Sequence, residues 1–397
     1  MRTLATMLLL SFILLAPSVV HAQLGEGSQQ IFSGPYSTGF SDSSSSAVTC
    51  CNGGSASVSG SPASNTPATG FAVDNIEYLF YIGSDRNVYM AYYISGQSWT
   101  TMNMTAKTGA PLAASGGGLT SFKYGSTQGH WCYVATDSHV HEMWWPTGGH
   151  YATDDLNAKS GAPNAALGSE LTSYNIDNEE FVYYIGTDSH LHLLYSTNDS
   201  STWSTIDITT SSGAPVPQTG TGLSSFPYGI QSHVFYFAPD PNYPVGEYWD
   251  LIEIYNNGGP WTFKNISGPT VPVITTLASF VYGSSYRLYY FYEPTRGDTQ
   301  HVYVYEQYAE TNTDVWFLDN PLNLSGALDF GYAPYGLVAF GFPPTGQIVL
   351  YLTGITNQQQ LQNLELVGTV QTNTWSQLNW INEVVPSGSP LVFGFYW

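Results

Sequence analysis

A phrase that returns about every fifty residues decides the fold of this chain. In one copy, Gly161-Ala-Pro163 leads to Leu171-Thr-Ser-Tyr174 and then to Phe181-Val-Tyr-Tyr-Ile-Gly-Thr-Asp188. The equivalent leucine is Leu119 in the copy before and Leu223 in the copy after, so these leucines are 52 residues apart each time. A period of this size, made only of short strands, predicts a ring or array of β-units, most often a propeller.

Six such units fit between residues 68 and 397. Their second strands are expected at Tyr78–Ile82, His130–Val134, Phe181–Ile185, His233–Phe237, Arg287–Phe291 and Gln347–Tyr351. Each unit then has a closing aromatic residue: Trp99, Tyr151, Trp203, Trp261, Trp316 and Trp375. Turn residues separate these landmarks, and no window after the N-terminus shows a helical pattern. We therefore expect an all-β fold, a six-bladed β-propeller of four-stranded blades.

The two ends of the chain bear on how the ring closes. Leu391-Val-Phe-Gly-Phe395 repeats the first-strand phrase with no further unit behind it, so we expect this C-terminal strand to pair with the first blade. Residues 23–67 are rich in Ser and Gly and poor in large apolar residues, which is typical of a tail or linker. A seventh blade is the alternative, and it would take about three strands from that stretch.

Residues 1–22 have the parts of a secretory signal peptide. Arg2 gives the positive start, an apolar run follows, and Val20-His-Ala22 is a cleavage site before Gln23. The chain also has four Asn-X-Ser/Thr sequons, at Asn103, Asn198, Asn265 and Asn323. These features predict a secreted, extracellular glycoprotein.

Composition narrows the choice of partners. Charged residues make up 9% of the chain and the net charge is −21, so DNA, RNA and anionic lipid should be repelled. No segment after the signal peptide is long and apolar enough for membrane insertion. The spacing of Cys50, Cys51 and Cys132 supports no metal site and leaves their pairing open. No cofactor is expected, and the oligomeric state is left open.

Two units place a histidine and a glutamate at matching positions. His130 and Glu142 share one unit, while His233 and Glu253 hold the same places in another. A carboxylate and a donor on neighbouring strands, beside aromatic rings, suit a neutral sugar, whose hydroxyls need acceptors and donors and whose apolar face needs a ring. The alternative is that these are ordinary strand residues with no ligand.

The repeat phrase resembles that of the fungal fucose-specific lectins over about residues 68–397. The shared features are an aromatic pair ending the second strand, a Thr-Asp turn, a Glu on the third strand and a Trp before Gly-Ala-Pro. The resemblance implies a six-bladed propeller with sugar sites between blades, each built from an Arg on strand two, a Glu on strand three and an aromatic residue from the next blade. It thus implies binding of fucose or another neutral sugar.

The chain departs from that pattern at several places. Only Arg287 matches the Arg, and the other units hold Tyr78, His130, Phe181, His233 and Gln347 there. Glu142 and Glu253 match the Glu, whereas two units hold Met90 and Leu193. In the fifth unit we expect this place near Val304, so no unit is expected to hold a complete Arg–Glu pair.

Three candidate sites follow from these positions. The first joins His233 and Glu253 with Phe291, the aromatic residue expected from the next blade. The second joins His130 and Glu142 with Trp144 or Trp145 as the stacking ring. The third has Arg287 with Tyr351 and lacks an acid.

An enzyme is less well supported. Ser196 to Trp203 loosely resembles the Asp-box turn of sialidases, but only Arg86, Arg287 and Arg296 remain after signal removal to bind a sugar carboxylate. Glu142 and Glu253 lie in non-adjacent units and should not meet as a glycosidase pair. We therefore expect a carbohydrate-binding lectin without catalysis, with glycans or glycoproteins as partners. The alternative is an extracellular wall or matrix interaction protein whose sugar sites have been lost.

Two His-X-His motifs raise the question of a metal. His139-Val-His141 and His190-Leu-His192 each place two imidazoles on one strand face. No third ligand is evident from the sequence, so no metal site is expected.

Overall fold

The computed structural model describes residues 47–50 and 54–57, residues 67–319 with short gaps, and the strands between 334 and 381. For residues 47–57 and 319–381 the description is of the backbone. Residues 1–22, predicted to be a signal peptide, Leu391–Phe395 and the sequons at Asn198 and Asn323 lie outside the described residues.

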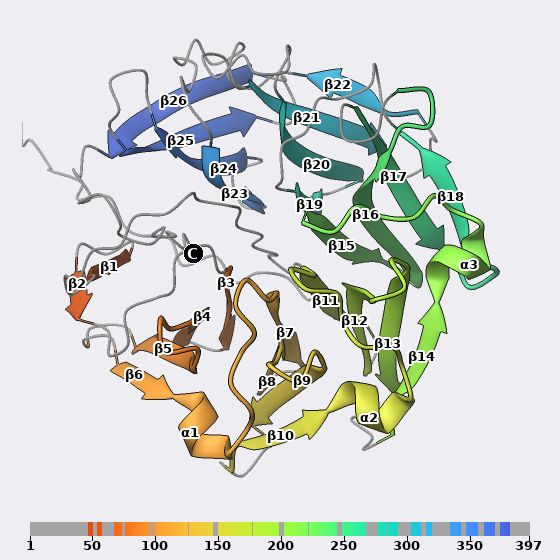
Figure 1. Ribbon diagram of the computed structural model, residues 1–397. Helices are drawn as coiled ribbons and strands as arrows, with labels where there is room; N and C mark the ends of the chain where they lie inside the picture. Colours follow the sequence, from red (N-terminus) through yellow and green to blue (C-terminus); the bar gives the residue numbers. More distant parts are fainter. Residues whose placement is uncertain are drawn as a thin grey trace, which may run out of the picture.

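The described chain forms six four-stranded antiparallel sheets and one two-stranded sheet. We call the four-stranded sheets blades 1 to 6 in chain order (Figure 1). Blades 1 and 2 are β3 (Ala68–Val73), β4 (Ile76–Ile82), β5 (Val88–Ile94), β6 (Thr100–Asn103), and β7 (Leu119–Tyr124), β8 (Gln128–Val134), β9 (Val140–Trp145), β10 (Ala152–Asp155). Blades 3 and 4 are β11 (Leu171–Ile176), β12 (Glu179–Ile185), β13 (Leu191–Thr197), β14 (Ser204–Asp207), and β15 (Leu223–Tyr228), β16 (Gln231–Pro239), β17 (Trp249–Asn256), β18 (Thr262–Asn265). Blades 5 and 6 are β19 (Leu277–Tyr282), β20 (Ser285–Tyr292), β21 (Tyr303–Glu310), β22 (Phe317–Asp319), and β23 (Pro334–Phe342), β24 (Gln347–Ile355), β25 (Leu361–Thr369), β26 (Thr374–Ile381).

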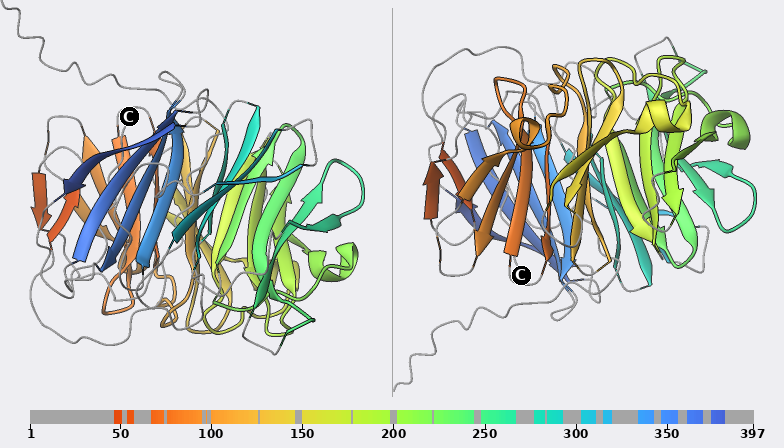
Figure 2. Two further views of the ribbon diagram at one scale, coloured as in Figure 1. Left: turned by 90° about the horizontal axis from the view of Figure 1, so that it is seen from above. Right: turned by 90° about the horizontal axis from the view of Figure 1, so that it is seen from below.

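The blades stand around a common centre, with the first strand of each innermost and the fourth outermost (Figure 1). Seen from the side, the strands run across the thickness of the molecule (Figure 2). The innermost strands of successive blades contact one another from β3 and β7 through to β19 and β23. This arrangement is a β-propeller, as the sequence period predicts.

The Thr-Ser part of the repeat phrase ties the inner strands together. Thr69 Oγ1 lies 2.8 Å from Ser121 Oγ of the next blade, and Thr120 Oγ1 lies 2.8 Å from Ser173 Oγ. The same bond recurs at the next two junctions, between Thr172 and Ser225 and between Ser224 and Ser279. Because these hydroxyls are buried, pairing them with each other removes the cost of leaving them unsatisfied.

Three one-turn helices were not expected from the sequence. They are α1 (Met104–Thr108), α2 (Leu156–Ser160) and α3 (Ile208–Ser212), each directly after a fourth strand. Their N-caps are Asn103, Asp155 and Asp207, and Gly109, Gly161 and Gly213 end them in the left-handed conformation. The Gly of the Gly-Ala-Pro phrase is therefore a helix stop. Five residues are too few to show a helical period, which is why pattern reading missed them. None of the described helices is long and apolar enough to cross a membrane.

The predicted second strands and most of the closing aromatic residues lie where the repeat pattern places them. All six expected second strands lie within β4, β8, β12, β16, β20 and β24. Tyr151, Trp203, Trp261 and Trp316 each directly precede a fourth strand, and Trp375 lies within one, while Trp99 is outside the described residues. The two-stranded sheet, β1 (Ala47–Cys50) with β2 (Gly54–Ser57), lies in the segment expected to be a tail or linker.

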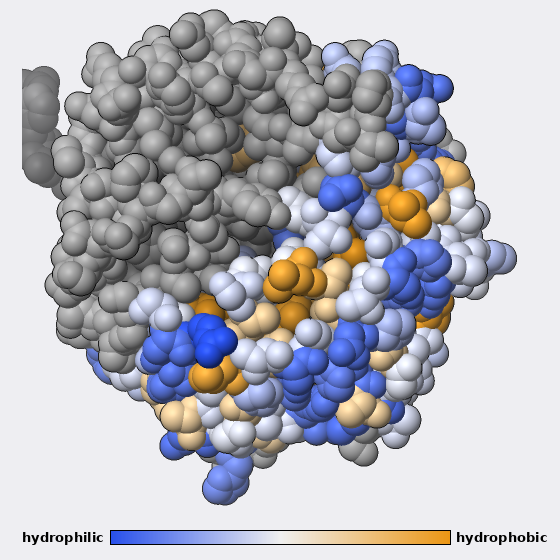
Figure 3. All heavy atoms as spheres, viewed as in Figure 1, coloured by the Kyte–Doolittle hydropathy of each residue, from blue (hydrophilic) through white to orange (hydrophobic). Residues whose placement is uncertain are grey.

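The core lies between the blades. One cluster joins blades 1 and 2 around Phe80 and Trp131, the next joins blades 2 and 3 around Cys132 and Val182, and further clusters join blades 3 to 4 and 4 to 5. Since side chains alternate along a strand, successive residues of one strand face opposite junctions. On the face of the ring seen in Figure 1, the described residues mix polar side chains with scattered apolar ones (Figure 3).

Candidate functional site

Strand pairing fixes three equivalent positions in each blade. The donor position lies on the second strand, opposite the aromatic end of the inner-strand phrase, and is held by Tyr78, His130, Phe181, His233, Arg287 and Val349. The acid position lies on the third strand and is held by Met90, Glu142, Leu193, Glu253, Glu306 and Glu365. The residue before a donor position faces the previous blade, and we call it the facing position. Gly129, Glu180, Ser232 and Tyr286 hold it in blades 2 to 5.

Two positions that the repeat pattern predicted are wrong. In blade 5, Val304 pairs with Phe291, whereas Glu306 pairs with Tyr289 and so holds the acid position. The long connection between β20 and β21 hid this, although Val304-Tyr-Glu306 repeats the pattern of Val140-His-Glu142. In blade 6, Val349 and not Gln347 holds the donor position. Blade 5 therefore has the complete Arg–Glu pair that the sequence analysis did not find.

The junction between blades 5 and 6 contains that pair. Arg287 Nη1 lies 2.5 Å from Glu306 Oε1, and both side chains are buried. Tyr289 donates its hydroxyl to the same carboxylate oxygen at 2.7 Å, and the guanidinium lies 4.7 Å from the ring centre of Tyr308. The buried Nε of Arg287 has no hydrogen-bond partner among the described residues. The side chain of Tyr351, expected in this site, lies outside the described side chains.

The junction between blades 4 and 5 contains His233 and Glu253. His233 Nδ1 lies 2.8 Å from Glu253 Oε1, and Nε2 lies 3.2 Å from the side-chain oxygen of Gln231. Blade 5 brings Tyr286, which donates to the same Gln231 oxygen at 3.0 Å and whose ring centre is 4.6 Å from that of His233. Phe226 stacks on the imidazole at 5.1 Å, and its ring centre lies 5.2 Å from that of Tyr286. The result is a buried polar group walled by aromatic rings.

Phe291 does not take part in that junction. It shares a strand face with Arg287 and Tyr289, while Tyr286, Leu288 and Tyr290 pack into the cluster with blade 4. The structure therefore turns Phe291 away from His233 and Glu253, and Tyr286 takes the place that was expected for it. The period of two along a strand would have shown this.

The junction between blades 2 and 3 has a different character. His130 Nδ1 lies 2.7 Å from Glu142 Oε1 and 3.0 Å from Glu180 Oε1, which blade 3 contributes. Trp144 stacks at 6.2 Å from His130, but Trp145 is on the opposite face and lies 4.7 Å from Tyr78 of blade 1. Of the two rings expected here, only Trp144 is at this junction.

Charge explains the state of this cluster. Burial would lower the pKa of His130, but the charges and hydrogen bonds of Glu142 and Glu180 outweigh it and raise the pKa. Burial and the charge of Glu180 raise the pKa of Glu142, although His130 acts in the opposite direction. The histidine is thus held as a cation between two acids: its Nδ1 faces both carboxylates, while its buried Nε2 has no hydrogen-bond partner among the described residues.

The two remaining described junctions have no acid at the acid position. Between blades 1 and 2, Tyr78 faces Met90, and between blades 3 and 4, Phe181 faces Leu193. Gly129 makes room for a ring, since a Cβ there would come within 2.2 Å of Trp145. Aromatic packing dominates these junctions, and between blades 3 and 4 the buried hydroxyls of Tyr174 and Tyr183 pair with each other at 2.6 Å.

Comparison with known proteins supports the fold. No protein-family model matches the sequence, and no curated protein matches it. Among solved structures, AofleA from Arthrobotrys oligospora aligns with a TM-score of 0.53 at 14% identity, over 80% of this chain and 86% of that chain. The SapL1 lectin in complex with alpha methyl fucoside aligns with a TM-score of 0.51 at 17% identity, over 81% and 97%. An ulvan lyase aligns with a TM-score of 0.51 at 12% identity, over 79% and 82%. The resemblance to fungal fucose-specific lectins is therefore confirmed at the level of the fold.

Proposed function

We propose that this chain is a non-enzymatic, carbohydrate-binding lectin. Its sites would lie at the junctions after blades 4 and 5, and fucose or another neutral sugar would be the ligand. The observation that carries the proposal is the Arg287–Glu306 pair, since both residues stand where the fucose-specific lectins have their sugar-binding Arg and Glu. His233 and Glu253 repeat this arrangement one blade earlier.

The groups present at these junctions suit a neutral sugar. Each glutamate is an acceptor for sugar hydroxyls, and the unpaired Nε of Arg287 is a donor for a ring or hydroxyl oxygen. Tyr308 beside Arg287, and Tyr286 beside His233, supply aromatic faces for the apolar side of the sugar. Histidine lacks the fixed fork of arginine, so we expect the site at His233 to be the weaker one.

Each of these two junctions presents one described carboxylate at its acid position. Hydrolysis of a glycosidic bond ordinarily takes two. Binding without catalysis is therefore the better-supported function. A glycan array with the purified protein tests it, and we expect signal on fucosylated glycans. An array without any glycan signal would leave the wall or matrix interaction protein as the explanation.

We further propose that the protein is exported and that its six blades form the whole ring. Blade 1 already has the four strands β3 to β6, so Leu391–Phe395 would be an additional strand of that blade if it pairs there as the sequence predicts. Mature protein should begin at or near Gln23, which N-terminal sequencing checks. Removal of residues 388–397 should lower the melting temperature, and an unchanged value would contradict closure by this strand.

A further inference from the structure

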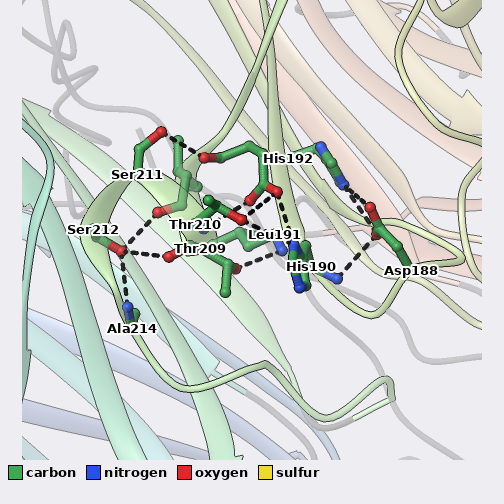
Figure 4. A network of polar contacts seen from close by, with 11 residues as sticks. Asp188, His190, Leu191, His192, Thr209, Thr210, Ser211, Ser212 and Ala214 are labelled. Atoms are coloured by element: carbon green, nitrogen blue, oxygen red, sulfur yellow. Dashed lines mark hydrogen bonds and ion pairs between the residues drawn. The ribbon is translucent and has the colours of Figure 1, made fainter.

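A second set of polar clusters lies at the far end of the same strands. In blade 3, the turn after β12 carries Asp188, and β13 begins just beyond it (Figure 4). His192 Nε2 lies 3.0 Å from both carboxylate oxygens of Asp188, and His190 Nδ1 lies 2.7 Å from Asp207 Oδ2. Ligand atoms of Asp188, His190 and Asp207 all lie within 4.8 Å of one another.

Blade 2 repeats this cluster. His141 Nε2 lies 2.9 Å from Asp137 Oδ2, and His139 Nδ1 lies 2.8 Å from Asp155 Oδ2. One ligand atom from each of these four residues lies within 4.8 Å of the others. The side chain of Asp137 is 43% exposed and that of His139 is 28% exposed, so solvent reaches the cluster.

The turn itself does not require these residues. In blade 1 the equivalent residues are Asp85, Asn87, Tyr89 and Asn103. Asp85 accepts from the Asn87 side chain at 2.7 Å and from the Tyr89 hydroxyl at 2.8 Å, and Asn103 caps α1 through its own amide oxygen. The same turn and the same helix cap therefore form without an imidazole, so blades 2 and 3 carry four extra histidines that the fold does not explain.

In blade 2 each carboxylate has one oxygen held from outside the cluster and the other directed at an imidazole. Asp137 Oδ1 accepts from the backbone N–H of His139, and Asp155 Oδ1 accepts from that of Ala158, so in each case Oδ2 faces an imidazole. Such support from outside the cluster orients ligands before a metal arrives. The sequence pattern shows two imidazoles per strand and no third ligand, whereas in the fold the turn and the helix cap supply carboxylates.

We propose that these two clusters bind a divalent transition metal such as Zn²⁺, one ion in blade 2 and one in blade 3. In blade 2, two imidazoles and two carboxylates suit zinc in a tetrahedral site; in blade 3, Asp188, His190 and Asp207 supply three ligands and leave the fourth position to water. Magnesium and calcium prefer oxygen ligands alone. Metal–ligand bonds of about 2.0–2.2 Å place tetrahedral ligand atoms roughly 3.3 Å apart. The hydrogen-bonded pairs, now 2.7–2.9 Å apart, therefore need to open slightly, and the other ligand atoms, which lie within 4.8 Å of one another, need to move to the same spacing, with the metal replacing the shared proton. This inference is independent of sugar binding, because the clusters lie at the opposite end of the strands from the donor positions.

Titration of tag-free, full-length mature protein with ZnCl₂ in a calorimeter tests the proposal. We expect one ion per cluster and, with Co²⁺ as the probe, visible absorption bands of a tetrahedral site. The decisive variants copy blade 1: His139→Asn with His141→Tyr removes one ion, and His190→Asn with His192→Tyr removes the other. Asp155→Asn keeps a helix cap, as Asn103 shows, and should weaken the blade 2 ion alone. His150→Ala, at an exposed histidine outside both clusters, should change nothing.

Two outcomes would overturn the proposal: no zinc heat with the wild type, or zinc binding that persists in the folded four-residue variant. Sugar titration of that variant separates the two ideas. We expect unchanged sugar binding, so a failure of one proposal leaves the other standing.

Discussion

The junction between blades 2 and 3 and the junction between blades 4 and 5 start from the same pair of residues. His130–Glu142 and His233–Glu253 have the same register and nearly the same contact, at 2.7 and 2.8 Å. They differ in the residue that the next blade supplies, which is Glu180 in one case and Tyr286 in the other. Glu180 adds a second acid and makes a closed charge cluster, whereas Tyr286 adds an aromatic wall.

This difference shows how one repeat can serve several purposes. Gly129 and Ser232 hold the facing position at the two junctions filled by aromatic packing. Glu180 holds it at the charged junction, and Tyr286 holds it at the polar site beside His233. The facing residue, together with the donor and acid positions, therefore decides what each junction does.

The largest expected effect comes from removing the cation at the first of these junctions. His130→Ala leaves Glu142 and Glu180 buried together, which should cost about 3–5 kcal/mol in the free energy of unfolding. His233→Ala leaves one buried acid and should cost less. Urea unfolding of both variants measures this, and equal losses would mean that Glu180 adds no charge penalty.

The same cluster should make stability depend on pH. The folded pKa of His130 is raised from 6.5 to about 10, so folding takes up a proton in this range. Its contribution is complete below pH 6.5 and is lost as the pH rises through about 10, so the free energy of unfolding should fall with rising pH. Glu142, whose pKa is also raised, acts in the same direction.

The control for this pH dependence is the triple variant His130→Phe, Glu142→Leu and Glu180→Ser, which copies the junction between blades 3 and 4. Replacing buried charges by apolar residues of that kind is often neutral or stabilising. We expect the variant to fold and to show a flatter pH profile in denaturant titrations. A profile as steep as that of the wild type would place the titrating group elsewhere.

A smaller loss of stability is expected at the junction between blades 1 and 2. Gly129→Ala puts a methyl group against Trp145 and Phe71 at separations below 3.0 Å, so the rings have to move. Overpacking of this kind costs about 1–3 kcal/mol. Thermal unfolding checks it, with Gly125→Asn as the control, because Gly125 has open space around it and the left-handed conformation that asparagine tolerates. Equal melting temperatures for Gly129→Ala and wild type would contradict the packing argument.

The smallest effect is expected from Tyr286→Phe, and a comparison with Phe291→Ala tests which of these two aromatic residues belongs to the site at His233. Tyr286→Phe removes one hydrogen bond to Gln231 and should cost about 1 kcal/mol in sugar binding or stability. Phe291→Ala should lower stability but leave the site at His233 unaffected, because it faces the next junction. Loss of that site in Phe291→Ala, with normal binding in Tyr286→Phe, would reverse the assignment.

The fold was predictable because its evidence is periodic. The spacing of Leu119, Leu171 and Leu223 gives the repeat, and alternation gives the second strands. The candidate sites were harder to predict because they depend on the register between neighbouring strands. The acid in blade 5 was displaced by a long connection before Glu306, and Glu180 and Tyr286 become partners only when two blades pack together. The helices were not predicted because a single turn shows no sequence period. The carboxylates of Asp155 and Asp207 were not predicted as histidine partners either, because these residues are the N-caps of two of those helices.

Calorimetric titration of fucose into the wild type, Arg287→Lys and Glu253→Gln tests the central claim most directly. Arg287→Lys keeps the charge beside Glu306 but loses the planar fork, and Glu253→Gln loses charge-assisted bonds worth about 1.5–3 kcal/mol, so each should weaken its own site about tenfold or more. Glu142→Gln, at the closed cluster, should leave the titration unchanged. Absence of heat with both fucose and galactose in the wild type, or full binding in the combined Arg287→Lys and Glu253→Gln variant, would contradict sugar binding at these junctions.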